Sequence, residues 1–507
     1  MKNATTKIDK MIELRQYQKD AVRFFATNVM AGKTGVIYDM DPGLGKTFTA
    51  HTCIKMLAKK GANVLYLTRK TLDIQAREEA IKLGLKPYLI KPGLSSKKTL
   101  EALSNVPLKS GKIVITKHGP FSRREVLEDT KTLKLIAERF DLLIVDEIQD
   151  FKNPNSIRSK CVMFMSRFIP YRITMSGTLV GNSELDVFVP CFISNPTVFG
   201  DSYFRFRSNY FIKNSFEIKV GDKRRTITKY KLRKALEHDF HQRLDSMKFS
   251  KRLKECLELP PLVKQTHMIE PNHEESQMMK NLQEELCCFL DSGETVTAAN
   301  LMERTIRLRQ LCSAVLSTET GEQFMHNHSK VEWLMDEVDT ILPSEQSFIP
   351  ESAPKIIIWT AFRTTCIGIR EMLEKKYHNP VATIIGGQSE DDRGGHLKMF
   401  QTDPHCHILV ATMGSGGVGL NLQQASYMIY FAKSYSQIED TQSEARAYRM
   451  GSERHSTIFR YDAIMKNSIE VDIEKALADK KTIVESIEHW RKTYGRDAVR
   501  DTVDYIE

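Results

Sequence analysis

Short apolar runs alternate with longer amphipathic stretches along most of the chain. This alternation is typical of α/β folds, in which parallel strands are joined by helices. Each apolar run is rich in β-forming residues and is followed by polar or glycine-containing turns. The predicted strands are residues 35–38, 63–67, 112–116, 142–145, 171–175, 355–359, 382–385, 407–410, 427–430 and 456–461. Because these strands fall into two groups, we predict two similar lobes, each built on a parallel sheet.

Between residues 200 and 330 the pattern becomes mostly helical and highly charged. Within this region, residues 216–230 alternate on either side of Gly221-Asp222, which is typical of a β-hairpin. The predicted domains are a first lobe over residues 1–200, helical insertions with a basic hairpin over 201–340, a second lobe over 341–481 and a C-terminal helix over 482–507.

The composition of the 507-residue chain is that of an ordinary globular protein, with 41% hydrophobic and 27% charged residues. The longest apolar run, 427–432, is far shorter than the about 20 residues that a membrane-spanning helix needs. Residues 1–13 contain no apolar segment of a secretory signal, and the nine cysteines form no C-x-x-C pair. We therefore expect no membrane association and a reducing compartment. That compartment is the cytoplasm of a prokaryote or infected host cell, or the nucleus of a eukaryote.

Charge and possible metal ligands narrow the function only slightly. The 74 lysines and arginines against 64 acidic residues give a net charge of +10, which favours a polyanionic partner but is modest for this length. His405, Cys406 and His407 form one compact group of possible ligands. Because no second group completes a four-coordinate site, we predict no metal there.

The strongest motif is DMDPGLGKT, which follows a predicted strand and opens a predicted helix. Gly43 and Gly45 allow a tight turn, so that backbone N–H groups and the helix N-terminus point at a phosphate chain. Lys46 would reach the β- and γ-phosphates of ATP, and the Thr47 hydroxyl would ligate Mg²⁺. Met40 stands where the usual G-x-x-x-x-G-K-T form has its first glycine. The alternative interpretation is a glycine-rich turn ahead of an ordinary basic helix.

A second motif, Asp146-Glu147, directly follows the apolar run LLIV. An acid at the carboxyl end of a parallel strand lies beside the phosphate loop of the same sheet. Asp146 would hold Mg²⁺, directly or through its water shell, and Glu147 would polarise the attacking water. Alone, this dipeptide is equally consistent with an exposed acidic turn. Its place downstream of the G-K-T loop favours the functional interpretation.

A third motif lies in the second half, where Gln442, Arg446 and Arg449 have the spacing i, i+4 and i+7 of one helix face. Two guanidinium groups there could stabilise the transferring phosphoryl group as arginine fingers. The alternative is a solvated helix face, salt-bridged through Glu439 and Glu444. The preceding segment TMGSGGVGLNL favours the functional interpretation, because its glycines allow close approach to a phosphate chain.

Taken in order, these motifs resemble those of the Swi/Snf-type ATPases of helicase superfamily two, from about residue 14 to 481. LRQYQ resembles the family's first motif, with Gln18 as the implied adenine contact. The stretch DEIQDFKNPNSIRSK is similar to the family's acid box, and MSGT to its coupling motif. The chain departs from the family at Gln149, Tyr448 and Ser452. These departures concern the coupling of hydrolysis to DNA and remove no phosphate- or metal-facing group.

The resemblance implies an α/β fold of two RecA-like parallel-sheet lobes that close on Mg·ATP, with a helical, charged insertion between them. It also implies a polynucleotide running across both lobes, held at its phosphates rather than its bases. The implied contacts are Thr68, Arg69, Lys70, Lys117 and His118 in the first lobe and Arg363 and Thr412 in the second. Each is also consistent with an ordinary solvated loop residue. The basic hairpin, with Lys223, Arg224 and Arg225, is either a DNA-gripping or strand-wedging element or a solvated surface.

We therefore expect an ATP-hydrolysing, nucleic-acid-stimulated motor that translocates on double-stranded DNA as a monomer, without processive strand separation. The motor takes up nearly the whole chain, which predicts a compact bacterial, phage or viral form. Two alternatives remain open. One is an RNA- or transcription-complex-directed ATPase, and the other is a nucleotide-gated DNA clamp in which hydrolysis serves only release.

Overall fold

The structure is a computed structural model of the chain. It describes residues 14–474, except 70–71, 109, 178, 180–182, 221–222, 292–297, 318–321, 327, 343–352, 417–419, 435 and 472. The side chains of 216–220, 223–227, 229, 283–291, 298–302, 304, 317 and 416 also lie outside the description. The described chain forms two compact units. Unit 1 comprises residues 14–214 and 229–257, and unit 2 comprises residues 258–474 together with 215–228.

Unit 1 is built on a seven-stranded sheet with the order β3-β4-β2-β5-β6-β1-β9, in which neighbouring strands are parallel. Its strands are β1 (Gly35–Met40), β2 (Val64–Thr68), β3 (Pro87–Leu89), β4 (Ile113–Lys117), β5 (Leu142–Val145), β6 (Tyr171–Ser176) and β9 (Lys248–Lys251). Its main helices are α1 (Gln16–Met30), α2 (Lys46–Ala58), α3 (Asp73–Lys82), α4 (Ser96–Asn105), α6 (Thr130–Ala137), α7 (Ile157–Ser166), α8 (Phe188–Ser194), α9 (Tyr203–Tyr210) and α10 (Glu237–Asp245).

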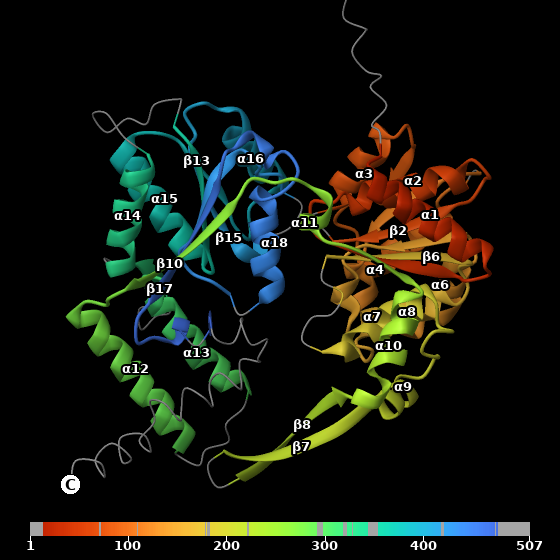
Figure 1. Ribbon diagram of the computed structural model, residues 1–507, viewed down its shortest axis with the longest axis horizontal. Helices are drawn as coiled ribbons and strands as arrows, with labels where there is room; N and C mark the ends of the chain where they lie inside the picture. Colours follow the sequence, from red (N-terminus) through yellow and green to blue (C-terminus); the bar gives the residue numbers. More distant parts are fainter. Residues whose placement is uncertain are drawn as a thin grey trace, which may run out of the picture. The chain divides into compact units, whose positions relative to one another are not determined.

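The sheet of unit 1 is covered on both faces, as its sequence requires. Strands β2 and β5 are buried along their whole length, and such unbroken apolar strands are typical of parallel sheets between two helix layers. Helices α1, α2 and α3 form one layer and α4, α6 and α7 the other (Figure 1). Because the strands are parallel, the segments that follow β1, β2, β4, β5 and β6 all leave the same edge of the sheet.

Unit 2 is built on a six-stranded parallel sheet with the order β10-β17-β16-β13-β15-β14. Its strands are β10 (Leu262–Ile269), β13 (Lys355–Thr360), β14 (Val381–Ile384), β15 (Ile408–Thr412), β16 (Ala425–Tyr430) and β17 (Ile458–Met465). Its helices include α12 (His273–Asp291), α13 (Ala298–Cys312), α14 (Ser329–Ile341), α15 (Arg363–Tyr377), α16 (Glu390–Thr402) and α18 (Gln437–Ala447). Alternate residues of β13 enter separate hydrophobic clusters, Ile356 and Ile358 in one and Ile357 and Trp359 in the other, so this sheet is also covered on both faces.

All ten predicted strands are strands in the structure, and the α/β class with two parallel-sheet lobes is confirmed. The predicted hairpin is also confirmed, as β7 (Phe211–Val220) and β8 (Lys223–Leu232), which form a two-stranded sheet. Strands β3, β9 and β10 of the two parallel sheets were not predicted. The sequence of β9, KFSK, contains a single apolar residue, and β10 is an edge strand whose residues are largely exposed.

The boundaries predicted at residues 200 and 340 remain a prediction, and the predicted C-terminal helix over 482–507 lies outside the described residues. Across the described part of the chain, none of the helices combines the length and apolar character needed to cross a bilayer. Nor do the described residues include a group of three or more His, Cys, Asp and Glu side chains placed to hold a metal ion.

Candidate functional site

The loop between β1 and α2 turns sharply at two glycines. Gly43 and Gly45 have φ angles of 94° and 71°, in the left-handed region that glycine adopts without strain. A Cβ on Gly45 would also lie 2.6 Å from Nε2 of Gln18, so a larger residue would displace that side chain. Helix α2 begins directly afterwards at Lys46, and the first N–H groups of a helix have no acceptor within it. The loop therefore has the geometry of an anion-binding turn.

Gln18 connects α1 to this loop. Its side chain is buried, and Nε2 donates a hydrogen bond of 3.1 Å to the carbonyl oxygen of Leu44. The backbone N–H of Arg15 donates to Oε1 of Gln18 at 3.0 Å, so both ends of the amide are engaged. The structure thus places the implied adenine contact directly against the phosphate loop.

The side chain of Lys46 reaches back across the loop, where Nζ donates to the carbonyl oxygen of Met40 at 2.7 Å. The coupling motif approaches from β6. A Cβ on Gly177 would lie 2.9 Å from the ring of Pro42 and 3.5 Å from Nζ of Lys46. The coupling motif therefore packs directly against the phosphate loop, and glycine is needed for this close approach.

The two predicted metal ligands, Thr47 and Asp146, meet at the buried side chain of Tyr66. The Tyr66 hydroxyl donates to Oδ2 of Asp146 at 3.5 Å and also hydrogen-bonds the Thr47 side chain. Burial raises the pKa of Asp146 to about 7; the charge of Glu147 adds to this and that of Lys46 opposes it. A nearby cation would favour the ionised form of this carboxylate. A buried carboxylate and a hydroxyl beside the phosphate loop fit Mg²⁺, which prefers oxygen ligands.

Glu147 follows β5 in an unusual backbone conformation. Its φ and ψ are both 52°, in the left-handed region that non-glycine residues rarely adopt and that is frequent at functional sites. Nε2 of Gln149 donates to Oε2 of Glu147, and the hydroxyl of Ser176 donates to Oε1 of Gln149 at 2.8 Å. Hydrogen bonds thus link the predicted water-orienting acid to the coupling motif.

Two implied nucleic-acid contacts of unit 1 already have acidic partners. Nε of Arg69 donates to Oδ2 of Asp150 at 2.7 Å, and Nζ of Lys117 lies 3.2 Å from Oδ2 of the buried Asp73. The ring of His118 also lies beside Asp150, 3.4 Å from Oδ2. A nucleic-acid phosphate would therefore have to compete with a carboxylate for Arg69 and Lys117.

The other implied contacts are placed differently. The side chain of Thr68 is fully buried, and its hydroxyl donates to Asp146 at 3.4 Å, which puts it on the nucleotide side of the strand end. Thr412 is the last residue of β15 and is mostly buried, whereas Arg363 is the first residue of α15. Lys70 lies outside the described residues. In the basic hairpin, the side chains of Lys223, Arg224 and Arg225 also lie outside them.

In unit 2, α18 carries two of the three predicted fingers. Gln442 and Arg446 lie in this helix and are buried. The helix ends two residues before Arg449, because Tyr448 has a ψ of 85° that no helix can continue. Nη1 of Arg449 instead donates to the carbonyl oxygen of Leu420 at 3.3 Å. The prediction that all three residues share one helix face is therefore wrong for Arg449.

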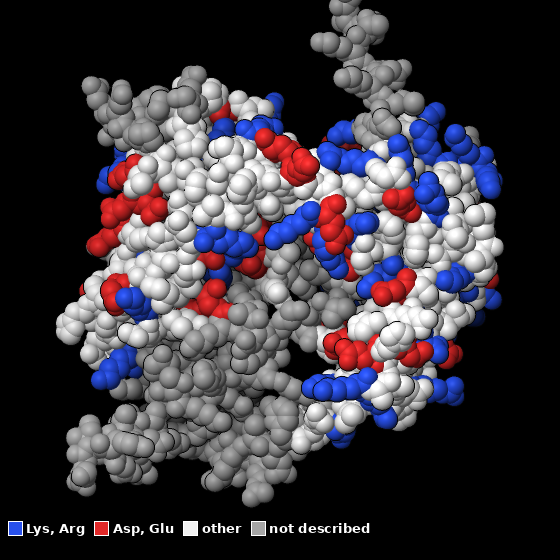
Figure 2. All heavy atoms as spheres, in the orientation of Figure 1, with Lys and Arg blue, Asp and Glu red and all other residues white. Residues whose placement is uncertain are grey.

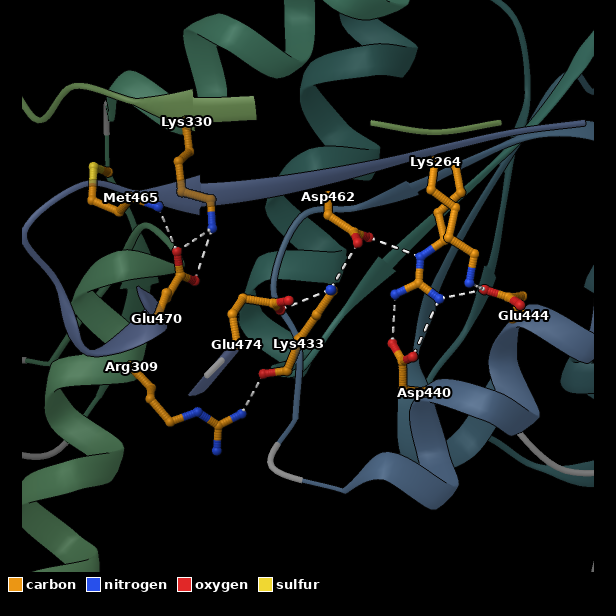
Figure 3. A network of polar contacts seen from close by, with 11 residues as sticks. Lys264, Arg309, Lys330, Lys433, Asp440, Glu444, Asp462, Met465, Glu470 and Glu474 are labelled. Atoms are coloured by element: carbon orange, nitrogen blue, oxygen red, sulfur yellow. Dashed lines mark hydrogen bonds and ion pairs between the residues drawn. The ribbon is translucent and has the colours of Figure 1, made fainter. Parts of the chain in front are cut away.

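The alternative interpretation named Glu439 and Glu444 as salt-bridging acids of this helix. Of these, Glu444 forms salt bridges, and so does Asp440, with cations on strands of the sheet. Glu444 lies 2.6 Å from both Lys264 on β10 and Arg460 on β17, and Asp440 lies 2.7 Å from Arg460 (Figure 3). Arg460 also contacts Asp462 at 3.0 Å and lies over the ring of Tyr430 at 3.9 Å. These contacts fix α18 on the sheet.

Sequence reasoning missed Arg252 and Arg460. Nη2 of Arg252 donates to Oδ2 of Asp39 at 2.7 Å, and Nη1 donates to Oδ1 of Asp41 at 3.3 Å. Arg252 thereby ties the start of the phosphate loop to the segment after β9. A lone arginine whose partner Asp39 lies 213 residues away gives no local signal.

Two family models match the chain. The model described as "Type III restriction enzyme, res subunit" matches residues 11–180, and the "Helicase conserved C-terminal domain" model matches residues 330–451. The first match spans the phosphate loop, acid box and coupling motif, and the second spans the core strands of unit 2 up to Arg449. The two matches together cover most of the parallel-sheet strands of both units.

Among the relatives is YwqA, a candidate ATP-dependent helicase/translocase of Bacillus subtilis, 23% identical over 75% of this chain. An uncharacterized ATP-dependent helicase of Mycoplasma pneumoniae is 22% identical over 97% of this chain. The structure titled "Sulfolobus solfataricus SWI2/SNF2 ATPase core in complex with dsDNA" is similar at a TM-score of 0.41 and 21% identity, over 93% of each chain. The chain spans 38% and 44% of the length of the two relatives named first.

The chain is thus similar to ATP-dependent helicases in both of its units, and the order of its motifs resembles that of the Swi/Snf-type ATPases of helicase superfamily two.

Proposed function

We propose that this protein hydrolyses ATP to move along double-stranded DNA. One observation carries the proposal. The phosphate loop, the acid box and the coupling motif meet at one edge of the unit 1 sheet. Arg69 follows β2 and Lys117 ends β4 at the same edge. This shared edge supports a nucleotide site with cations beside it. The names of the bacterial relatives, helicase and helicase/translocase, support the same class of activity.

In the proposed reaction, water attacks the γ-phosphorus of ATP, the bond to the β,γ-bridging oxygen breaks, and ADP and inorganic phosphate leave. Lys46 and the N–H groups that open α2 bind the β- and γ-phosphates, and Gln18 contacts the adenine. Thr47 and Asp146 would hold Mg²⁺, which neutralises charge on the phosphates when it is bound. Glu147 orients the water and accepts its proton.

The second lobe contributes positive charge in the transition state. We assign this role to Arg446 and Arg449, with Gln442 as a supporting polar group. Two observations support the assignment: Gln442 and Arg446 are buried, and ion pairs fix α18 to the sheet. A catalytic arginine must be held in a defined position, and both features would hold it there.

The proposed polynucleotide contacts are those to the phosphate backbone, so no sequence specificity is expected. In unit 1, Arg69 and Lys117 are the described cations proposed for this role, and Lys70, Arg363, Thr412 and the basic hairpin are further candidates. The buried Thr68 contacts Asp146 instead. Figure 2 shows lysines and arginines interspersed with acidic residues on the described surface in view. Basic and acidic side chains are therefore mixed on that face. We place the protein, as a monomer, in the cytoplasm of a bacterium or infected host, or in the nucleus if it is eukaryotic.

The ATPase rate measured with duplex DNA, single-stranded DNA and RNA tests this proposal. We expect the strongest stimulation with duplex DNA and none of that stimulation in Glu147→Gln. Stronger stimulation by RNA would favour the RNA- or transcription-directed alternative. Duplex binding that depends on ATP without any stimulation of turnover would favour the clamp.

A further inference from the structure

The acid box continues from Glu147 into a single turn of 3₁₀-helix, Ile148–Phe151, whose polar side chains face two different parts of the site. Gln149 contacts Glu147 and Ser176 on the nucleotide side. The next residue, Asp150, contacts Arg69 and His118, which follow β2 and β4. Two adjacent residues of one short turn therefore contact different parts of the proposed site. Gln149 contacts groups proposed to act on ATP, and Asp150 contacts groups proposed to bind nucleic acid.

The pair between Asp150 and Arg69 is well formed but accessible. Nε of Arg69 donates to Oδ2 of Asp150 at 2.7 Å and Nη2 donates to Oδ1, the two-point geometry that a guanidinium makes with a carboxylate. Each side chain remains 21% exposed. Arg69 lowers the pKa of Asp150 well below its usual range, while burial lowers the pKa of His118 and leaves that ring neutral at pH 7. Arg69 is therefore the charged partner of Asp150.

A nucleic-acid phosphate can bind Arg69 with the same two-point geometry as the carboxylate of Asp150. A phosphate and a carboxylate can each accept two parallel hydrogen bonds from a guanidinium. A phosphate can therefore replace the carboxylate of Asp150 and keep both hydrogen bonds to Arg69. The high charge density of a polynucleotide favours this replacement. The backbone N–H of His118 donates to the carbonyl oxygen of Thr68 at 3.0 Å, so the loops after β2 and β4 are joined and would meet the same backbone.

On the side of the proposed nucleotide site, the turn holds the side chain of Glu147 through a hydrogen bond from Gln149. The left-handed backbone of Glu147 depends on the turn that follows it. The backbone N–H of Asp150 donates to the carbonyl oxygen of Glu147 at 3.0 Å, which closes this turn. A shift of Asp150 would therefore be passed to Glu147 through one short, strained turn.

We propose that Asp150 is a positioning residue that holds Arg69 when no nucleic acid is bound, and that a backbone phosphate takes over Arg69 and so releases the turn that carries Glu147. The inference rests on the proposed function and specifies how the same site is regulated. The binding of nucleic acid is then coupled to the conformational change that activates Glu147. Because the coupling is reciprocal, each event makes the other more favourable. Removing the charge of Asp150 should mimic the presence of DNA.

The test compares ATPase rates and duplex affinity of the full chain in Asp150→Asn, which keeps the shape and loses the charge. We expect the rate without DNA to rise by roughly fivefold or more, the lower end of typical coupling between sites, with the DNA-stimulated rate unchanged. Duplex affinity should rise by a similar factor, because Arg69 is no longer held by a carboxylate. The matched control is Glu128→Gln, which removes one acid from an exposed pair with Arg124 in the same unit and should alter neither quantity.

Two further variants separate a specific role from a general loss of structure. In Arg69→Gln, the added change Asp150→Asn should have no effect on duplex affinity, because the residue it releases is gone. Arg69→Lys keeps the charge but loses the fork, so the rate without DNA should rise as in Asp150→Asn while duplex affinity falls. This opposite pair of effects also tests the inference if Asp150→Asn does not fold.

A rate without DNA that stays at the wild-type level in both Asp150→Asn and Arg69→Lys would overturn the inference. If the wild type is stimulated by duplex DNA and these variants are not altered, the proposed function stands and this inference alone fails. A wild type that no duplex stimulates contradicts the proposed function, and the rates without DNA still decide the inference.

Discussion

The two units share a parallel-sheet architecture but hold their functional side chains in different ways. In unit 1 the candidate residues sit at strand ends, as Asp146 does after β5, and are fixed mainly by backbone geometry and short hydrogen bonds. In unit 2 the candidate Arg446 sits on α18, which ion pairs centred on Arg460 fasten to the sheet (Figure 3). A site on strand ends is positioned by the fold itself, whereas a site on a helix needs a separate set of contacts.

The ion pairs of unit 2 extend beyond α18. Lys433 lies 2.8 Å from Asp462 and 2.7 Å from Glu474, and Nη2 of Arg309 on α13 donates to the carbonyl oxygen of Lys433 at 2.8 Å. Lys330 is fully buried and contacts Glu470 at 2.9 Å. In unit 1, Arg252 plays a comparable role, because it pairs with Asp39 and Asp41. Changes to the ion pairs of unit 2 should therefore affect catalysis through stability, and changes to the acidic side chains at the strand ends of unit 1 should affect catalysis alone.

Among residues proposed to act in the transition state, the largest effect is expected at the arginine fingers. Arg446→Ala should lower kcat by about 10³–10⁵-fold while leaving ATP affinity nearly unchanged, because a finger acts mainly in the transition state. Steady-state kinetics with a separate nucleotide-binding titration measure the two quantities. Equal losses in binding and turnover would show that the helix is structural. Arg449→Ala, outside the helix, is the matched comparison and should behave in the same way.

In unit 1, Glu147→Gln should reduce hydrolysis by about 10²–10⁴-fold, the usual contribution of a general base. ATP should still bind, and the thermal unfolding midpoint should be that of the wild type. Lys46→Ala should abolish hydrolysis by weakening phosphate binding. Hydrolysis of Glu147→Gln within about threefold of wild type would contradict the role of Glu147.

The comparison between the units is sharpest at Arg460, which is only 3% exposed. Arg460→Met removes one partner of a buried ion cluster and should lower the free energy of unfolding by about 3–5 kcal/mol. Chemical denaturation measures this loss. Arg307→Met breaks the exposed pair with Glu303 in the same unit and should cost at most about 1 kcal/mol. Equal losses of unfolding free energy in the two variants would contradict the proposal that Arg460 holds α18 on the sheet.

The smallest effect is expected at the basic hairpin. Replacing Lys223, Arg224 and Arg225 with alanine should weaken duplex binding and leave the ATPase rate without DNA intact. Each lost phosphate contact changes the slope of log K against log salt by about 0.9, so the slope should fall by roughly 2 to 3 units. Fluorescence anisotropy across a salt series measures it, with circular dichroism as the folding control. An unchanged slope in a folded variant would show that the hairpin is a solvated surface.

Motifs and strands could be predicted from the sequence where the signal is local. The run LLIV followed by Asp146 is one continuous signal, and so is the turn at Gly43 and Gly45. The partners of these residues could not be predicted. Arg69 and Asp150 lie 81 residues apart, and their contact exists only because β2 and β5 are neighbours in the sheet.

The position of Arg449 shows the same limit on a shorter scale. Its spacing from Arg446 is compatible with a helix, but the backbone of Tyr448 ends the helix first, and helix ends are poorly encoded in sequence. Thr68 was predicted as a nucleic-acid contact because it follows a strand. Its burial against Asp146 depends on the packing of that strand, which the pattern of the chain does not contain.

The most direct test of the central claim is displacement of a third strand from a triplex by the full chain with ATP. A motor that moves along duplex DNA should displace the strand in an ATP-dependent manner, and Glu147→Gln should bind the same duplex without displacing it. A wild type that hydrolyses ATP in the presence of duplex DNA and leaves the triplex intact would contradict translocation.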